Sequence, residues 1–330
     1  MSTYLNDPTA TIFLLGERLK KRGYTEKTEI YGGVTFHLYT KNNRTWITNG
    51  FKISYPFNSK AITEISVDKA IGYDFALRQG VSVPATVSIL PDDEELDEAK
   101  RLLEHFQKII VKPLDSSLAN GVTLNIKNRA GLEQAVQAAR HYSSTVLAQE
   151  QVHGDELRFA VVNGKAVAAL LRQTARIIGD GKRTIQQLIE DENKDRATLD
   201  KTYFEYPQLD ESLIDPELIN DERILADKEV LELSHSAMAR YGASMYNVLS
   251  DVDKGYIEIV ERLGSALSRD FIVVDVMIAD YGAACTPDNY WFIEFNTSPV
   301  LKLFHGTRGG NHVDIVGLVA ERIDNSIQAS

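Results

Sequence analysis

The sequence predicts a mixed α/β protein, because apolar runs typical of buried strands alternate with amphipathic helical segments along its 330 residues. The strongest strand signal is a hairpin. Two apolar runs at 157–162 and 165–172 flank Asn163-Gly164, a dipeptide typical of two-residue β-turns. The clearest helical segment is 254–268, where apolar residues recur every three or four positions. A chain of this length can bury a sizeable core.

The first 64 residues fit a small α/β unit. Residues 11–23 form an amphipathic segment that ends at Gly23, a residue that commonly terminates helices. Two strand-like segments follow at 29–37 and 45–53, and the polar residues 41–44 between them predict a hairpin turn.

The middle of the chain continues the alternation of helices and strands. We expect a helix at 66–79, capped by Ser66 and ended by Gly80. Residues 195–226 are acidic with weak periodicity, which indicates surface loops. The remaining expected helices are 92–106, 131–141, 184–192 and 314–327, and the remaining strands are 81–87, 109–115, 122–127, 144–149, 271–278 and a strand that begins at 291.

Composition argues against several classes of partner. There are 36 Lys and Arg residues against 47 Asp and Glu, so the net charge is −11 and neither nucleic acid nor an anionic membrane is an expected partner. Cys285 is the single cysteine, which excludes a disulfide framework and a thiolate zinc site. The start of the chain lacks the pattern of a signal peptide, and no apolar run has the length of a membrane span. We therefore expect a cytoplasmic protein.

Two adjacent strands near the end of the chain carry candidate metal ligands. Asp275 stands inside the apolar run 271–278, where an uncompensated carboxylate would be costly. Glu294 and Asn296 are two residues apart on the next strand and therefore point to the same face. Carboxylate and amide oxygens are ligands that magnesium takes. The alternative is a buried Asp held by backbone amides and a Glu exposed at a strand end.

Basic residues at strand and helix ends are candidates for binding an anion. Lys112 ends an apolar strand and precedes a proline, so its ammonium lies at the edge of a sheet. The small residues 116–121 after it can lay backbone amides over anionic oxygens; the alternative is an ordinary hairpin with a snorkelling lysine. Lys69 lies in the first turn of its expected helix, and most such lysines are simply solvated. Arg158 and Arg172 lie on neighbouring strands, where both can reach one cleft.

Several of these segments, taken together and in order, resemble the ATP-grasp ligases. The segments are Val111-Lys112-Pro113-Leu114-Asp115 with Gly121-Val122-Thr123, then 162–172 with 178–185, then Val274-Asp275-Val276-Met277 with 293–299. They are most similar to the ligase domains of cyanophycin synthetase and bifunctional glutathione synthetase, and the last pair is similar to D-alanine–D-alanine ligase. The resemblance covers roughly residues 65–325. It implies an ATP-grasp fold of two α+β lobes (65–149 and 150–330) that hold ATP between them, after an N-terminal α/β domain (1–64).

The resemblance also implies how ATP would be bound. Lys69 and Lys112 would hold its phosphates beneath a loop that contains Ser116, Ser117 and Gly121. The adenine would meet the hinge Glu150-Gln151-Val152, and the ribose hydroxyls would be bound by Glu156.

Metal binding and catalysis would fall to the other singled-out residues. Asp275, Glu294 and Asn296 would bind two Mg²⁺ ions, with Mn²⁺ as a substitute. The transferring phosphoryl group would be stabilised by Arg172, Arg158 and Lys112.

The implied activity is ATP-dependent ligation of a carboxylate to an amine through an acyl phosphate, with release of ADP and phosphate. Amino acids or short peptides are the expected substrates, contacted by Ser298 and His305, although a loop histidine can also be merely exposed. Many relatives self-associate, so a homodimer is expected. The alternatives are a phosphotransferase that acts on a hydroxyl and a nucleotide-binding module without turnover.

Two departures from the family bear on these expectations. Ser116 and Ala119 stand where the phosphate loop usually has glycine, which puts the closing motion of the loop in question. The second catalytic domains of cyanophycin synthetase and of the bifunctional enzyme do not fit in a chain of this length, so neither complete activity is expected.

Overall fold

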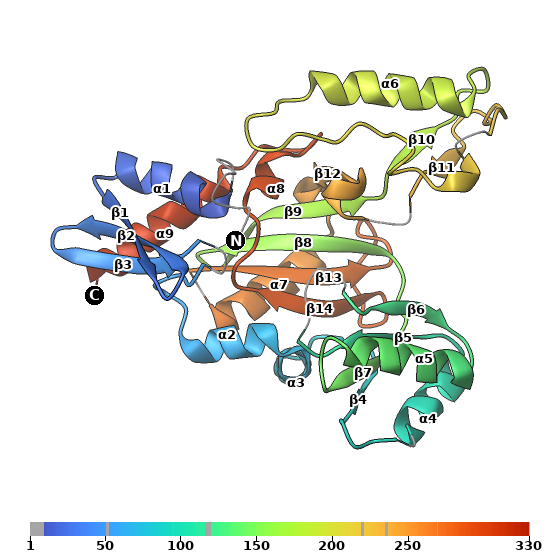
Figure 1. Cartoon of the computed structure of the whole chain (residues 1–330), viewed down its shortest axis with the longest axis horizontal. Helices are drawn as coiled ribbons and strands as arrows, with labels where there is room; N and C mark the ends of the chain where they lie inside the picture. The colour runs from blue at the N-terminus through green and yellow to red at the C-terminus, as the bar shows by residue number, and fades with distance from the viewer. Residues whose placement is uncertain are drawn as a thin grey trace.

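The structure is a computed structural model of the chain. It describes residues 10–50, 53–94, 96–115, 120–218, 221–234, 237–268 and 270–329. Among these residues the strands form a central five-stranded sheet, a four-stranded sheet, a three-stranded sheet and a two-stranded ribbon. Figure 1 shows the N-terminal elements beside the C-terminal helix α9 (Ile315–Ala329) at one end of the molecule, and the four-stranded sheet at the other.

The central sheet is antiparallel, and its strand order is β12-β9-β8-β13-β14. The hairpin of β8 and β9 turns at Asn163 and Gly164, which both have positive φ (52° and 71°), as two-residue hairpin turns require. The strands are β8 (Asp155–Val162), β9 (Lys165–Gln173), β12 (Ser244–Asn247), β13 (Phe271–Ile278) and β14 (Tyr290–Asn296).

Side-chain alternation gives this sheet two different faces. Leu157, Phe159 and Val161 point to the face that packs on α7 (Lys254–Leu267). Ala160 and Val162 point to the opposite face, which helix α9 covers. The same opposite face also carries four charged residues, Glu156 and Arg158 of β8, Arg172 of β9 and Asp275 of β13. The sheet therefore has an apolar half that anchors the fold and a polar half that is available for chemistry.

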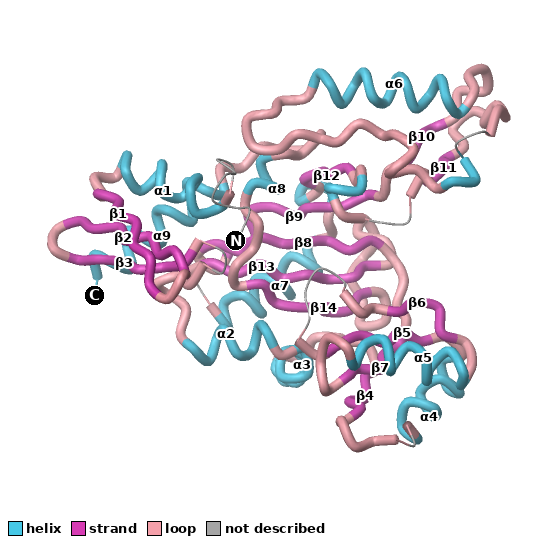
Figure 2. The backbone as a smooth tube through the Cα atoms, in the orientation of Figure 1, coloured by secondary structure: helices cyan, strands magenta, loops and turns pink. Residues whose placement is uncertain are grey.

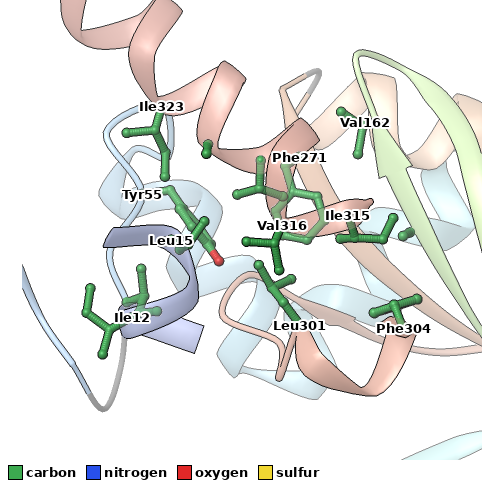
Figure 3. Close-up of a cluster of buried hydrophobic side chains, with 14 of the residues drawn as sticks. Ile12, Leu15, Tyr55, Val162, Phe271, Leu301, Phe304, Ile315, Val316 and Ile323 are labelled. Atoms are coloured by element: carbon green, nitrogen blue, oxygen red, sulfur yellow. The ribbon is translucent and has the colours of Figure 1, made fainter. Parts of the chain in front are cut away.

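The two ends of the chain share one hydrophobic core, which Figure 3 shows in close-up. Helix α1 (Thr11–Lys21) packs against α9, and α9 packs against the sheet of β1 (Thr25–Tyr31), β2 (Val34–Lys41) and β3 (Arg44–Asn49). The buried side chains labelled in the figure are Ile12, Leu15, Tyr55, Val162, Phe271, Leu301, Phe304, Ile315, Val316 and Ile323. Burial of this shared core couples residues from the beginning, the middle and the end of the chain.

The four-stranded sheet has a separate core. Its strand order is β4-β7-β5-β6, and the helices α4 and α5 pack on it. The elements are β4 (Thr86–Ile89), α4 (Asp97–Phe106), β5 (Ile109–Pro113), β6 (Thr123–Ile126), α5 (Arg129–Arg140) and β7 (Val146–Glu150). Since β5 and β6 pair as an antiparallel hairpin, the expected strand–loop–strand arrangement after Lys112 is confirmed.

An extension between β9 and β12 has a third, smaller core. It contains β10 (Arg176–Ile178), helix α6 (Ile185–Thr198) and β11 (Val230–Glu232), together with short 3-10 turns. Thr184 begins α6 with a capping box that involves Gln187. Figure 2 shows that the described chain between α6 and β11 runs mainly as loop, as predicted for 195–226, except that residues 195–198 belong to α6.

Several element predictions were wrong in their boundaries, including the helix expected at 92–106, which begins at Asp97, and the helix expected at 184–192, which continues to Thr198. The helix expected at 66–79 is two helices, α2 (Lys60–Val67) and α3 (Lys69–Arg78), because the Asp68 side chain accepts hydrogen bonds from the first amides of α3 and breaks the run. The strand expected at 29–37 contains a turn at Gly32 and Gly33, both with positive φ. Regular strand in the segment 81–87 begins only at Thr86.

No helix in the described part of the chain combines the length and the apolar character needed to cross a lipid bilayer.

Candidate nucleotide and metal site

Three charged residues lie in one row across the central sheet. In the strand register, Asp275 on β13 stands opposite Arg158 on β8 and opposite Glu294 on β14. A β-bulge in β14 at Ile293 lets Phe292 and Phe295 pack on the α7 side of the sheet while Glu294 points to the other face. The expected pairing of the two ligand-bearing strands is therefore confirmed.

The first pair in this row is a buried ion pair. Arg158 donates from Nε to Asp275 Oδ1 (2.8 Å) and from Nη2 to Oδ2 (2.5 Å). The Asp275 side chain is 1% exposed, so the guanidinium compensates a charge that water cannot reach. Although burial opposes the charge, the Asp275 carboxylate raises the pKa of Arg158. The Arg158 guanidinium thus binds the carboxylate of Asp275, which is a predicted metal ligand.

Glu294 completes a patch of opposite charges. Its Oε2 lies 3.9 Å from Lys69 Nζ, and its Oε1 lies 4.0 Å from Arg158 Nη2. The side chain as a whole is 32% exposed, but its carboxyl end is enclosed by these groups and by Asp275. Burial and the neighbouring Asp275 carboxylate raise the pKa of Glu294. An added cation would therefore stabilise the charged form of Glu294.

Lys112 approaches the same place from the four-stranded sheet. Its Nζ donates to the Tyr73 hydroxyl (2.7 Å) and to Gln149 Oε1 (2.8 Å), and its side chain is 6% exposed. Burial lowers the pKa of Lys112 to about 8, although the Glu294 carboxylate acts in the opposite direction. Two lysines from different elements thus face one carboxylate.

Tyr73 and Gln149 were missed by sequence reasoning, and a signal existed for each. Tyr73 is four residues after Lys69 on α3 and shares its helical face. Gln149 stands diagonally across from Lys112 in the β5–β7 pair, because its direct partner is Ile110. The Gln149 amide also donates to Thr86 Oγ1 (2.7 Å), which fixes the orientation of the carbonyl toward Lys112.

Arg172 and Glu156 continue the polar face. The Arg172 guanidinium pairs with the Glu156 carboxylate across β9 and β8, while the buried Arg172 Nε has no hydrogen-bond partner among the described residues. Asn296 Oδ1 accepts from the Ser298 amide (3.2 Å), and the Ser298 hydroxyl accepts from the Ile53 amide (3.0 Å). Ser298 is therefore tied to the N-terminal segment beside the candidate ligands.

The hinge between the two larger sheets is ordered by local contacts. The Glu150 amide donates to Ala85 O (2.8 Å), and Gln151 Oε1 accepts from the Asn125 amide (2.7 Å). Val152 is half-buried. At Gly154 the φ is +133°, and a Cβ atom would lie 2.2 Å from Ile278 O. The close approach of the backbone at 154 to the backbone at Ile278 therefore requires glycine.

The remaining site expectations have different outcomes. Ser116 and Ser117 lie outside the described residues. Gly121 has a φ of +74° and packs against Pro113 and Tyr142, which gives it a structural reason to be glycine. The side chain of His305 lies in the interior, and its expected contact with a substrate stays a prediction.

The side chain of His305 is buried, with 0% of it exposed. The ring stacks on Tyr203 with 4.3 Å between centroids, and Nε2 accepts from the Val316 amide (3.3 Å). Burial lowers the pKa of His305 to about 4, so the ring is neutral near pH 7.

The donor set suits magnesium better than a transition metal. No group of three or more His, Cys, Asp or Glu side chains arranged to hold a metal occurs among the residues that the structure describes. Asp275, Glu294 and Asn296 instead offer two carboxylates and one amide oxygen, and Mg²⁺ commonly takes one or two carboxylates together with substrate phosphates. Burial and the Asp275 carboxylate raise the pKa of Glu294, while Lys69, Arg158 and Lys112 act in the opposite direction.

A surface hollow near the start of α4 is a poor alternative. It has a volume of about 600 Å³, and its wall is formed by Asp92, Asp93, Glu94, Asp97 and Glu98. Such an acidic wall repels phosphate oxygens.

Comparison with solved structures identifies the fold. A bifunctional glutathione synthetase from Pasteurella multocida matches 96% of the chain with a TM-score of 0.67 at 19% identity, and the match covers 44% of that protein. D-alanyl-alanine synthetase A from Vibrio cholerae matches 99% of the chain and 96% of its own length, with a TM-score of 0.58 at 12% identity. The chain has the ATP-grasp fold.

Sequence comparison also finds curated relatives of this chain. It is 24% identical over 291 residues to the glutathione biosynthesis bifunctional protein of Clostridium perfringens (82% of this chain, 36% of that protein). It is 27% identical over 254 residues to the cyanophycin synthetase of Crocosphaera subtropica (73% and 28%). The chain thus spans about a third of the length of these curated relatives. No protein-family model matches the chain.

Proposed function

We propose that this protein is an ATP-dependent carboxylate–amine ligase that forms an amide through an acyl phosphate and releases ADP and phosphate. One observation carries the proposal. Asp275 and Glu294 meet on the polar face of the central sheet, and Lys69 and Lys112 approach them from outside that sheet. Alternating positive and negative groups at one point suit a triphosphate and its metal ions. Homology to ATP-grasp ligases supports the same reaction class.

ATP would lie between the lobes 65–149 and 150–330. Lys69 and Lys112 would bind the phosphates, and the backbone of the hinge 150–152 would meet the adenine. Glu156, now paired with Arg172, would accept the ribose hydroxyls. Arg172 would then be free to turn toward the transferring phosphoryl group.

The metal site would be formed by Asp275, Glu294 and Asn296. Bound Mg²⁺ supplies positive charge against the oxygens of the transferring phosphoryl group. The protein holds the ligands in place: the strand register fixes Asp275 against Glu294, and the Ser298 amide fixes the Asn296 carbonyl oxygen.

The chemistry would need positioning and charge rather than a nucleophilic side chain. A donor carboxylate oxygen bonds to the γ-phosphorus while the bond to the β-phosphate oxygen breaks, so ADP leaves. An amine nitrogen then bonds to the carbonyl carbon, and phosphate leaves with the donor oxygen. The nitrogen releases its proton to solvent. Exclusion of water protects the acyl phosphate between these steps.

The substrates would be small carboxylates and amines such as amino acids or short peptides. The test is incubation with ATP, Mg²⁺ and pooled carboxylates and amines, with phosphate release and mass spectrometry of new amides as readouts. Once a substrate pair is found, a donor labelled with ¹⁸O in its carboxylate should transfer one ¹⁸O to the released phosphate. ADP formation without phosphate would indicate transfer to a hydroxyl instead, and phosphate without ¹⁸O would contradict the acyl phosphate.

Glu294→Gln is the matched loss-of-function variant for this assay, because it keeps the size of the side chain and removes its charge. We expect ADP release to fall by at least about a hundredfold with the fold intact by circular dichroism. Unchanged turnover in Glu294→Gln would refute the metal assignment.

A further inference from the structure

Arg158 forms a bidentate ion pair with Asp275, a residue that the proposed function assigns to the metal. Two guanidinium nitrogens bond the two Asp275 oxygens at 2.8 and 2.5 Å, and Nη2 also lies 4.0 Å from Glu294. The register places Arg158, Asp275 and Glu294 on three successive strands, so a buried sheet holds this contact rather than a flexible surface loop. Such bidentate pairs are strong and directional.

The charges at this point are already balanced by the protein itself. Asp275 and Glu294 contribute two negative charges, while Arg158 and Lys69 contribute two positive charges within 4.0 Å of them. Lys112 adds a further nearby cation. A divalent ion that approaches without a nucleotide meets carboxylates that have cations beside them, and it is repelled by those cations.

We propose that Arg158 is an internal counterion that withholds Asp275 from divalent cations until a polyphosphate is bound. The inference rests on the proposed function. Arg158, Lys69 and Lys112 are hydrogen-bond donors that can be shared between the carboxylates and phosphate oxygens. A bound polyphosphate draws these donors away and leaves the carboxylates for the metal, so nucleotide and metal bind with positive coupling.

The alternative is a purely structural ion pair. Removal of Arg158 would then only leave Asp275 buried without a partner, and the fold would weaken with no gain in metal affinity. The two roles predict opposite changes in metal binding. A measurement of metal affinity in the absence of turnover therefore distinguishes the counterion role from the structural role.

The experiment measures binding of Mn²⁺ alone, by electron paramagnetic resonance of the free ion, to the full chain without nucleotide. Arg158→Met keeps the apolar stem but removes charge and donors, whereas Arg158→Lys keeps the charge and is the matched control. We expect Arg158→Met to bind Mn²⁺ at least tenfold more tightly than wild type, and Arg158→Lys, which keeps the charge but loses the bidentate contact, to gain less affinity than Arg158→Met. Equal or weaker binding by Arg158→Met would overturn the inference.

A thermal readout keeps the test decisive if Arg158→Met is unstable. We expect Mn²⁺ to raise its melting temperature by several degrees more than it raises that of wild type. In the double variant Arg158→Met/Asp275→Asn, which removes both charges, this extra rise should disappear. Extra stabilisation that persists in the double variant would also overturn the inference.

A second arm separates this inference from the proposed function. Wild type is titrated with Mn²⁺ in the presence of the ATP analogue AMP-PNP, and the Mn²⁺ that AMP-PNP binds without protein is measured separately and subtracted. We expect at least tenfold tighter Mn²⁺ binding to the protein than without AMP-PNP. If Mn²⁺ does not bind even with AMP-PNP, the proposed metal site itself fails. If it binds with AMP-PNP while Arg158→Met gains no affinity for Mn²⁺ alone, the role of Arg158 fails and the proposed function stands.

Discussion

Replacement of Lys112 by methionine should abolish a proton uptake that accompanies nucleotide binding. Burial lowers the pKa of this lysine to about 8, so at pH 8 roughly half of the molecules carry it without a proton. A phosphate group placed against Nζ favours the charged form and raises this pKa. Binding of ADP at pH 8 should therefore take up roughly half a proton from the buffer.

Isothermal titration calorimetry in two buffers of different ionisation enthalpy measures this uptake directly. Wild type should show a difference in apparent binding enthalpy that corresponds to the roughly half proton, and Lys112→Met should show almost none. The same lysine should affect stability. Its pKa is about 8 in the folded chain and about 10.4 in the unfolded chain, so the unfolded state holds the extra proton between these values. Stability should accordingly rise with pH by roughly 3 kcal/mol across that window.

Urea denaturation at pH 7.5 and pH 10.5 checks this second effect. Because other groups titrate equally in both proteins, the difference between wild type and Lys112→Met isolates the lysine. Parallel pH dependence in the two proteins, or ADP binding to wild type without proton uptake, would refute the reasoning that a buried ammonium is held ready for phosphate.

Two further predictions concern the frame around the site. Gly154→Ala should lower the free energy of unfolding by at least about 3 kcal/mol in urea, because its Cβ would lie 2.2 Å from Ile278 O at a φ of +133°. Gly32→Ala is the control, since its φ of +57° meets open space and costs only about 1 kcal/mol. His305 has a folded pKa of about 4 and an unfolded pKa near 6.5, so its contribution to stability is present above pH 6.5 and is lost as the pH falls toward 4. His305→Asn should lack that loss, which we expect to reach roughly 3 kcal/mol; equal acid sensitivity in both proteins would contradict the neutral core histidine.

Periodicity and turn chemistry predicted much of the sheet framework. The Asn163-Gly164 hairpin formed because both residues tolerate positive φ, a local property visible in the sequence. The pairing of the last two strands was also predictable, since each is a short apolar run and they are close in sequence. By contrast, the break at Asp68 was missed because the residues on both sides of it continue one helical pattern. The Asp68 carboxylate accepts hydrogen bonds from backbone amides and so ends one helix and begins the next.

The sequence predicts which residues form the site better than it predicts which of them contact one another. Asp275, Glu294, Lys69 and Lys112 could be singled out as charged residues at strand or helix positions that need a partner. The pairing of Arg158 with Asp275 depends on the register of β8 against β13, and the position of Glu294 depends on a bulge at Ile293 in β14; neither has a local signal in the sequence. The burial of His305 likewise depends on α9, which reaches it from the end of the chain.

The most direct test of the central claim is a crystal structure with Mn²⁺ and AMP-PNP, read by the anomalous scattering of manganese. We expect a manganese peak within coordination distance of Asp275 and Glu294 oxygens, with the phosphates against Lys69 and Lys112. A manganese peak elsewhere, or a nucleotide bound on another face while this cluster stays closed, would contradict the assignment.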